Sequence, residues 1–107
     1  MSRERLPNRR ASVVFEVESF NLPFTVSVSK YGDGRPAEIF VTNHRAGSAA
    51  GIMASDAAIC ASLALQHGCP VAVLRKALSR DAQGHASSPL GVALDLIAAE
   101  LEAEATP

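Results

Sequence analysis

Polar and hydrophobic residues alternate along three stretches in the first half of the chain, a pattern typical of β-strands with one buried face. The stretches cover residues 12–20, 24–31 and 37–42. The side chains that we expect to face the core are Val13, Phe15, Val17, Phe24, Val26, Val28, Ala37, Ile39 and Val41. The connections "NLP" and "GDGRP" contain turn-forming residues, so the three strands are predicted to form an antiparallel meander.

A sheet of only three strands has two open edges, and an open edge presents unpaired backbone groups to other chains. On the third stretch, Phe40 shares the outward face with Glu38 and Thr42. An aromatic side chain on a polar face indicates an interface. We therefore expect the protein to form a homodimer through its edges or faces.

Beyond Ser48 the apolar residues recur at helical spacing. The first predicted helix begins at Ser48, or later at Ser55, and ends at Gly68, a residue type typical of helix C-termini. Its apolar stripe, which we expect to face the core, consists of Ile52, Ile59, Cys60 and Leu63.

Two further helices follow. The second begins at Pro70, buries Val71, Leu74 and Leu78, and exposes Arg75, Lys76 and Arg80. The third covers residues 88–104, with Ser88 as its cap and Pro89 at its first position. Its buried stripe is Leu90, Leu94, Ile97 and Leu101. Three strands followed by three helices predict an α+β fold, with the helices packed on one face of the sheet.

The length of 107 residues predicts one domain. We expect a basic N-terminal arm over residues 1–10, with Arg3, Arg5, Arg9 and Arg10, and a single α+β domain over residues 11–104. No apolar run approaches the roughly 20 residues of a membrane span. No apolar segment follows the charged N-terminus, so we expect no signal peptide, no membrane association and a cytoplasmic location.

The residues that usually carry metal or catalytic chemistry are few and scattered. The two cysteines, Cys60 and Cys69, do not make a disulfide framework. Together with His67 they lack the paired spacing of zinc sites. No nucleophile elbow and no pair of carboxylates with a base is present. We therefore predict no metal, no cofactor and no independent catalysis.

Polar donors gather where the third strand gives way to the first helix: Asn43, His44, Arg45, Gly47 and Ser48. A helix N-terminus carries unpaired N–H groups and a partial positive charge, which favour phosphate-like anions. Arg35, beyond the preceding turn, could assist if the sheet brings it to the same side. These residues predict a site for an anion or nucleotide, and the alternative is a well-capped turn.

Residues 55–80 indicate a second kind of site, because they form a helix, a glycine turn and a helix that carries Arg75, Lys76 and Arg80. DNA-binding helix-turn-helix units share this order. Plain helical hairpins share it too, and a net charge of −1 is not that of a nucleic-acid-binding domain. We keep nucleic-acid binding as an alternative function.

The segments "TVSVSKYGDGRPAEIFVTNHRAGS", "DAAICASLALQHGCPVAVLRKAL" and "SSPLGVALDLI" together resemble a known domain family. They are similar to the TSCPD domain at the C-terminal end of adenosylcobalamin-dependent ribonucleotide reductases, in a free-standing version. The resemblance covers about nine tenths of the chain. It implies a relation to ribonucleoside-diphosphate reductase, whose chemistry lies in a large barrel that 107 residues cannot contain. The chain also lacks the "TSCPD" segment and a C-terminal cysteine pair, so no catalytic residue carries over.

These observations lead to three hypotheses. The first is a non-catalytic accessory or regulatory module that binds a nucleotide-like anion or a reductase-type partner. The second is a nucleic-acid-binding module. The third is a reductase subunit that acts in trans with a partner supplying the barrel.

Overall fold

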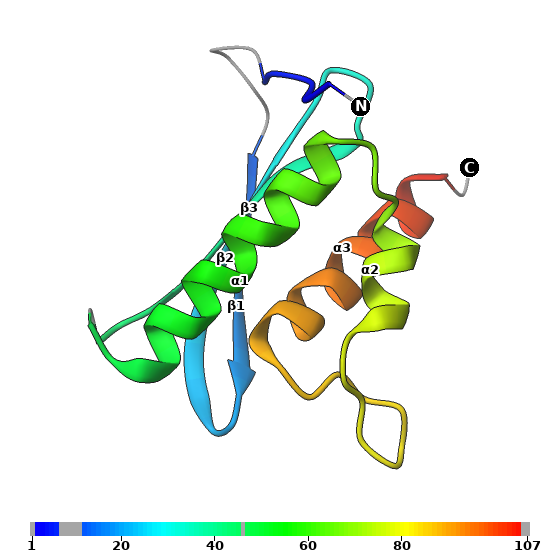
Figure 1. Cartoon of the computed structure of the whole chain (residues 1–107). Coiled ribbons are helices and arrows are strands. Elements are labelled where there is room, and N and C mark those ends of the chain that lie inside the picture. Colours follow the sequence, from blue (N-terminus) through cyan, green and yellow to red (C-terminus); the bar gives the residue numbers. More distant parts are fainter. Residues whose placement is uncertain (1, 7–11, 46, 106–107) are drawn as a thin grey trace.

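Three antiparallel strands and three helices form the fold in the computed structural model, which describes residues 2–6, 12–45 and 47–105 (Figure 1). The strands are β1 (Ser12–Ser19), β2 (Leu22–Lys30) and β3 (Pro36–Asn43), and the helices are α1 (Ala49–Gln66), α2 (Val71–Ala77) and α3 (Pro89–Ala105). The sheet order is β1-β2-β3, and the helices cover one face. The predicted α+β meander is confirmed.

The core lies between this face of the sheet and helices α1 and α3. Phe24, Val26 and Val28 of β2 are almost wholly buried, as are Ile39 and Val41 of β3. The register places Val26 opposite Phe15 on one side and Val41 on the other, so the predicted inward residues share one face. From α3, the core receives Leu90, Ala93, Leu94 and Ile97, which confirms most of the stripe predicted for that helix.

A two-residue turn joins β1 to β2. Ser19 pairs with Leu22, and both turn residues, Phe20 and Asn21, have positive φ values of 54° and 58°. This is the turn geometry that suits the twist of a hairpin, but asparagine or glycine normally occupies it. A bulky residue at positive φ carries strain of about 1–2 kcal/mol. Because the turn has only two residues, strand β2 begins at Leu22. The "NLP" sequence had predicted a longer connection between the two strands.

The side of α1 that packs on the sheet is opposite to the side that the sequence predicted to be buried. Its buried side consists of small residues, Ala54, Ala58 and Ala61, with Leu65 near the end. The predicted core stripe of Ile52, Ile59, Cys60 and Leu63 is exposed. Alanines let the helix axis approach β3 closely, and larger side chains at these positions would hold it away.

Close approach allows α1 to cover the open edge of β3. The Ser62 hydroxyl accepts a hydrogen bond from the Ile39 N–H at 2.8 Å and lies 3.1 Å from the Ile39 carbonyl and 2.9 Å from that of Ala58. The Gln66 amide donates to the Ala37 carbonyl at 3.0 Å. A helix laid along an edge strand protects it from pairing with other chains. The expectation of two open edges is therefore wrong for β3.

The helix ends follow standard capping rules. Ser48 caps α1, so the earlier of the two predicted starts is confirmed. After α1, Gly68 has a φ of 95°, and the N–H groups of Gly68 and Cys69 donate to the carbonyls of Leu65 and Ala64. This is the hydrogen-bond pattern of a glycine C-cap. The sequence correctly predicted Gly68 as the stop signal.

Helix α2 is shorter than predicted and ends at Ala77. Arg80 therefore lies beyond the helix, where it forms an isolated bridge with Ala86. Helix α3 starts at the predicted place, because the Ser88 hydroxyl accepts a hydrogen bond from the Gly91 N–H at 3.1 Å.

The described part of the N-terminal arm, residues 2–6, lies against the rest of the domain. The Glu4 N–H donates to the Gln66 carbonyl at 2.9 Å, and the Tyr31 hydroxyl donates to the Glu4 carbonyl at 2.7 Å. The predicted boundary between residues 10 and 11, together with Arg9 and Arg10, lies outside the described residues.

One helix, α1, is an exception to the expectation that no segment is long and apolar enough to span a membrane. With 18 residues it is long and apolar enough to cross a membrane by length and composition alone. It packs against the sheet, however, and its buried side contributes to the core. Core helices of globular domains pass the same test.

The edge-covering hydrogen bonds yield a stability prediction. Replacing Ser62 with alanine leaves the buried Ile39 N–H without a partner, which costs about 1–3 kcal/mol. We expect the melting temperature of Ser62→Ala to fall by several degrees. Ser27→Ala, on the outer face of β2, is the matched control and should change little. Equal losses in both variants would show that Ser62 has no special role at the edge.

Candidate functional site

The turn between β3 and α1 uses three of the five predicted anion-site residues for its own structure. The Asn43 side chain donates to the Pro23 carbonyl at 2.8 Å and accepts from the Arg45 N–H at 3.0 Å. The Ser48 hydroxyl accepts from the Gly51 N–H at 3.1 Å. Gly47 has a φ of 80°, a conformation that favours glycine. Asn43, Gly47 and Ser48 therefore build the turn.

The other two residues of the cluster, His44 and Arg45, project into solvent. Neither side chain makes a hydrogen bond or ion pair within the described residues. Arg45 lines a shallow hollow of about 310 Å³, together with Gly51, Ile52 and Asp56. The carboxylate of Asp56 on this hollow disfavours an anion. Arg45 and His44 are thus the two side chains of the cluster that are available to a ligand.

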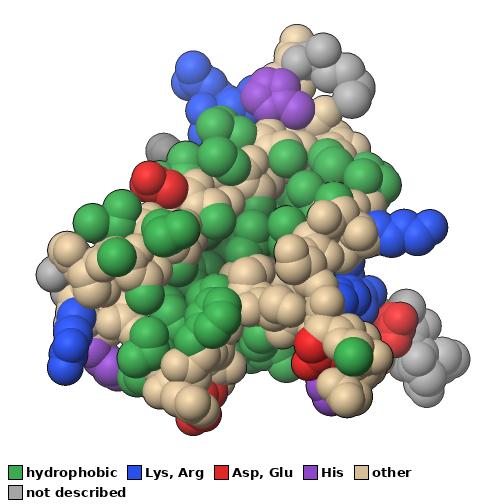
Figure 2. Space-filling model, turned by 60° about the horizontal axis from the view of Figure 1, so that its bottom comes forward, with side chains coloured by type: hydrophobic (Ala, Val, Ile, Leu, Met, Phe, Trp, Pro, Cys, Tyr) green, Lys and Arg blue, Asp and Glu red, His purple; other side chains and the backbone are tan. Residues whose placement is uncertain are grey.

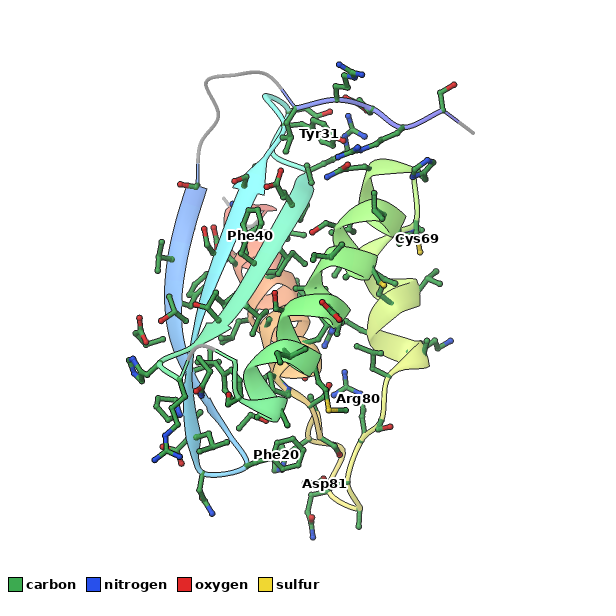
Figure 3. The ribbon with its side chains drawn as sticks, turned by 60° about the vertical axis from the view of Figure 1, so that its left-hand side comes forward. Phe20, Tyr31, Phe40, Cys69, Arg80 and Asp81 are labelled. Carbon is green, nitrogen blue, oxygen red and sulfur yellow. The ribbon has the colours of Figure 1, made fainter. Side chains whose placement is uncertain are left out.

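Arg35 does not belong to this cluster, which corrects its assignment as a possible contributor. It precedes β3, whereas Asn43 ends that strand, so the full length of β3 separates them. Arg35 pairs with Asp33 at 2.7 Å and with Glu4 at 3.0 Å. Its guanidinium lies 4.7 Å from the centre of the Tyr31 ring. Figure 3 shows Tyr31 beside the N-terminal segment, at the end of the molecule opposite to Phe20.

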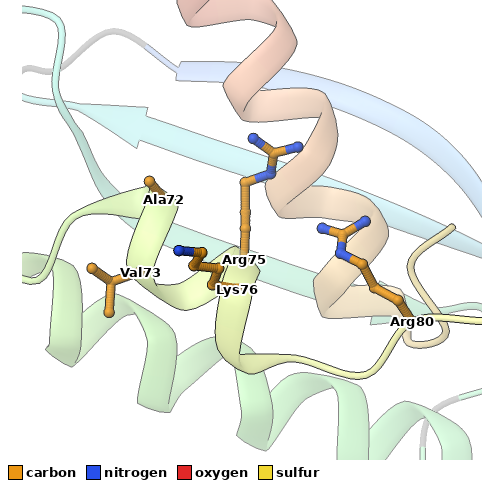
Figure 4. Close-up of a pocket in the computed structure, with 5 residues that line it drawn as sticks. All are labelled: Ala72, Val73, Arg75, Lys76 and Arg80. Atoms are coloured by element: carbon orange, nitrogen blue, oxygen red, sulfur yellow. The ribbon is translucent and has the colours of Figure 1, made fainter. Parts of the chain in front are cut away.

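The basic residues predicted for nucleic-acid binding are arranged around one carboxylate. Arg75 Nε donates to Asp95 at 2.8 Å, and Arg80 donates to both oxygens of Asp95 at 2.7 and 3.0 Å. Figure 4 shows both guanidinium groups directed toward α3, which carries Asp95, whereas Lys76 points away from it. Together with Ala72 and Val73, the three cations border a hollow of about 470 Å³.

This arrangement fixes the charge of Asp95. Hydrogen bonds from Arg80 and then Arg75 lower the pKa of the Asp95 carboxyl from its usual 3.8 to about 2. Two of the three predicted DNA-contacting cations are thus engaged in joining α2 and the following loop to α3. The three side chains do not form a continuous row of cations open to a phosphate backbone.

The cysteines are separate and both are free. Cys60 is exposed on α1, and Cys69 is partly buried after the helix. Among the described residues, no group of three or more histidine, cysteine, aspartate or glutamate side chains could hold a metal ion.

An apolar groove that the sequence did not predict lies at the end of the molecule that carries the β1–β2 turn. Hydrophobic side chains surround a hollow on this side of the molecule (Figure 2). The groove has a volume of about 560 Å³. It is lined by Phe20, Phe24, Ala50, Met53, Ala54, Ala57, Leu78, Ser88, Pro89 and Leu90. Two features of the sequence could have indicated this groove: the unusual phenylalanine in the β1–β2 turn, and the alanines of α1.

The architecture defines a small α+β module with exposed hydrophobic side chains. The TSCPD domain family matches residues 4–104, and the chain therefore belongs to this family. This confirms the resemblance found in the sequence.

Curated relatives of the chain are named vitamin B12-dependent ribonucleotide reductase. The protein from Agrobacterium fabrum is 38% identical over 69 residues, which are 64% of this chain and 5% of that protein. The protein from Rhodopirellula baltica is 33% identical over 89 residues, 80% of this chain and 9% of the relative. The chain thus spans less than a tenth of either relative. No solved structure matches the chain.

The lowered pKa of Asp95 yields a prediction about acid stability. Because the carboxylate is favoured in the folded state, its contribution is complete above about pH 4 and disappears as the pH falls through about 2. We expect Asp95→Asn to be less stable than the wild type at pH 7, by on the order of 1 kcal/mol after solvent screening. The difference should shrink below about pH 4 and be lost only as the pH falls below about 2.

Urea unfolding at several pH values checks this prediction, with Asp56→Asn as the control. Asp56 makes no ion pair within the described residues, so its variant should follow the wild type throughout. A gap between Asp95→Asn and the wild type that stays constant with pH would contradict the assignment.

Proposed function

We propose that this chain is a non-catalytic accessory or regulatory module of a ribonucleotide reductase, acting in the cytoplasm by contact with the reductase chain. The observation that carries the proposal is its membership of the TSCPD family over residues 4–104. Its curated relatives contain the corresponding sequence as a small part of a much longer reductase.

Surface composition supports action by protein contact. The exposed side of α1 carries four large hydrophobic side chains, Ile52, Met53, Ile59 and Leu63. Contiguous apolar surface on a small domain is a mark of interaction sites. A homodimer through sheet edges would use β1, since α1 occupies the edge of β3. The side chains of Glu16 and Glu18 are exposed on β1 and would oppose that pairing.

The decisive test is capture of the adenosylcobalamin-dependent reductase chain from the same cells by the immobilised full-length protein. We expect specific retention of the reductase and a change in its turnover or allosteric response when the module is added. An Ile59→Asp/Leu63→Asp variant that still folds should lose retention if α1 makes the contact. Absence of both retention and any change in turnover would refute the proposed function.

A second candidate function is binding of a nucleotide-like anion by Arg45 and His44. The favouring observation is that both side chains project beside the N-terminus of α1 without partners in the described residues. A ligand at a hundredfold excess over its dissociation constant stabilises a fold by about 2.7 kcal/mol, which is a shift of several degrees.

We expect ribo- and deoxyribonucleoside triphosphates to raise the melting temperature of the wild type if this site operates. Arg45→Ala should then abolish the shift without lowering the melting temperature of the unliganded protein. Lys76→Ala removes an exposed cation elsewhere and is the control. If no nucleotide changes the melting temperature, the nucleotide site is refuted and the cluster has only the structural role of a turn.

A further inference from the structure

The outward side of α1 carries three large apolar residues and one aspartate at regular spacing, Ile52, Asp56, Ile59 and Leu63, which we name the outer stripe. At 3.6 residues per turn these positions fall within an arc of about 60°. Their spacing of four, three and four residues is that of the contact positions of a coiled coil. Ile52, Ile59 and Leu63 expose 50%, 50% and 41% of their surface, and Met53 beside them exposes 71%.

The stripe lies opposite the side of α1 that packs on the sheet. Ala54, Ala58, Ala61 and Leu65 are buried there. Only 33% of α1 is buried, although its mean composition is strongly apolar over 18 residues. Large hydrophobic side chains exposed together along one side of a helix mark a surface that a partner can cover. The outer stripe is therefore a surface that another helix can cover.

Asp56 decides what kind of helix fits. It lies in the middle of the stripe, it is exposed, and it makes no ion pair or hydrogen bond within the described residues. Burying an unpaired carboxylate costs several kcal/mol, whereas a lysine or arginine placed opposite offsets that cost. Arg45 borders the same hollow but makes no ion pair with Asp56.

A second copy of the chain does not supply the required charge. Helix α1 contains no lysine or arginine. In a parallel pairing, the two Asp56 carboxylates would face each other. In an antiparallel pairing centred on the stripe, Ile52 would face Leu63 of the second copy, and the two carboxylates would lie about 5 Å apart along the helix axis. Either arrangement desolvates two like charges, which selects against that partner.

We propose that the outer stripe docks an α-helix of a different protein, with an apolar seam interrupted by one lysine or arginine that pairs with Asp56. This inference shares one premise with the proposed function, namely that the chain acts by contact with another protein. It specifies the chemistry of the partner element: leucine or isoleucine side chains at heptad spacing, with one basic residue at the level of Asp56.

The test uses two synthetic three-heptad helical peptides that differ at one seam position, arginine in one and glutamate in the other. We expect the wild-type protein to bind the arginine peptide at least about tenfold more tightly than the glutamate peptide. Asp56→Lys should reverse this preference, and because it changes only an exposed side chain it keeps the fold. The reversal identifies the charge pair itself.

Hydrophobic contact is tested separately with Ile59→Asp, which should abolish binding of both peptides. Phe40→Asp is its matched control, because Phe40 is 46% exposed on the outer face of the sheet and should not matter. Circular dichroism of both variants checks that they are folded. Equal affinity for the two peptides, or no change with Asp56→Lys, would overturn the proposal.

Analytical sedimentation of the wild type tests the alternative that a second copy of the chain covers the outer stripe. A dimer that Ile59→Asp disrupts and Asp56→Leu strengthens would show that a second copy occupies the stripe, and would overturn the proposal. The peptide data also separate this inference from the proposed function. Peptide discrimination without reductase capture or any change in turnover supports the stripe and refutes the proposed function. Reductase capture without peptide discrimination overturns the stripe proposal and leaves the proposed function standing.

Discussion

The structure depends on the way α1 covers the edge of β3. Ser62 and Gln66 satisfy backbone groups of Ile39 and Ala37 that would otherwise be buried without partners. That constraint fixes the rotation of α1 about its own axis: alanines must face the sheet and the larger side chains must face outward. Gln66 also receives the N-terminal segment, through its carbonyl and its side chain. The exposed hydrophobic side of α1 is thus a geometric result of protecting a strand edge.

Two groups of charged residues in the described part of the chain join separate elements of the fold. Lys30 of β2 pairs with Glu100 of α3 at 2.7 Å, and both side chains are largely buried. Asp95 joins Arg75 and Arg80, which attaches α2 and the loop after it to α3. Residues that look like binding groups in the sequence therefore have structural roles in the fold. The side chains of Asp56, Arg45 and His44 differ from these residues, because none of the three makes a hydrogen bond or ion pair within the described residues.

The sequence was sufficient for the elements and their order, because alternation, capping residues and glycines are local signals. Ser48, Gly68 and Ser88 mark helix ends through bonds to residues a few positions away. The orientation of α1 was not predictable by the same means, since Ile52, Ile59 and Leu63 form a better apolar stripe than the alanines do. The decisive contacts, from Ser62 and Gln66 to β3, join residues more than 20 positions apart. Arg35 and the anion cluster were likewise grouped by sequence proximity, although the length of β3 separates them.

The order of the elements along the chain has a kinetic consequence. Each strand lies beside the next one in sequence, and α1 packs on β3, the strand that it follows. Short loop closures therefore build the sheet and its first helix, and low contact order is associated with rapid folding. The contacts that bridge long stretches of chain, Glu4 with Gln66 and Lys30 with Glu100, can form only on that completed framework. We therefore expect the N-terminal segment and α3 to dock after the sheet and α1 have formed.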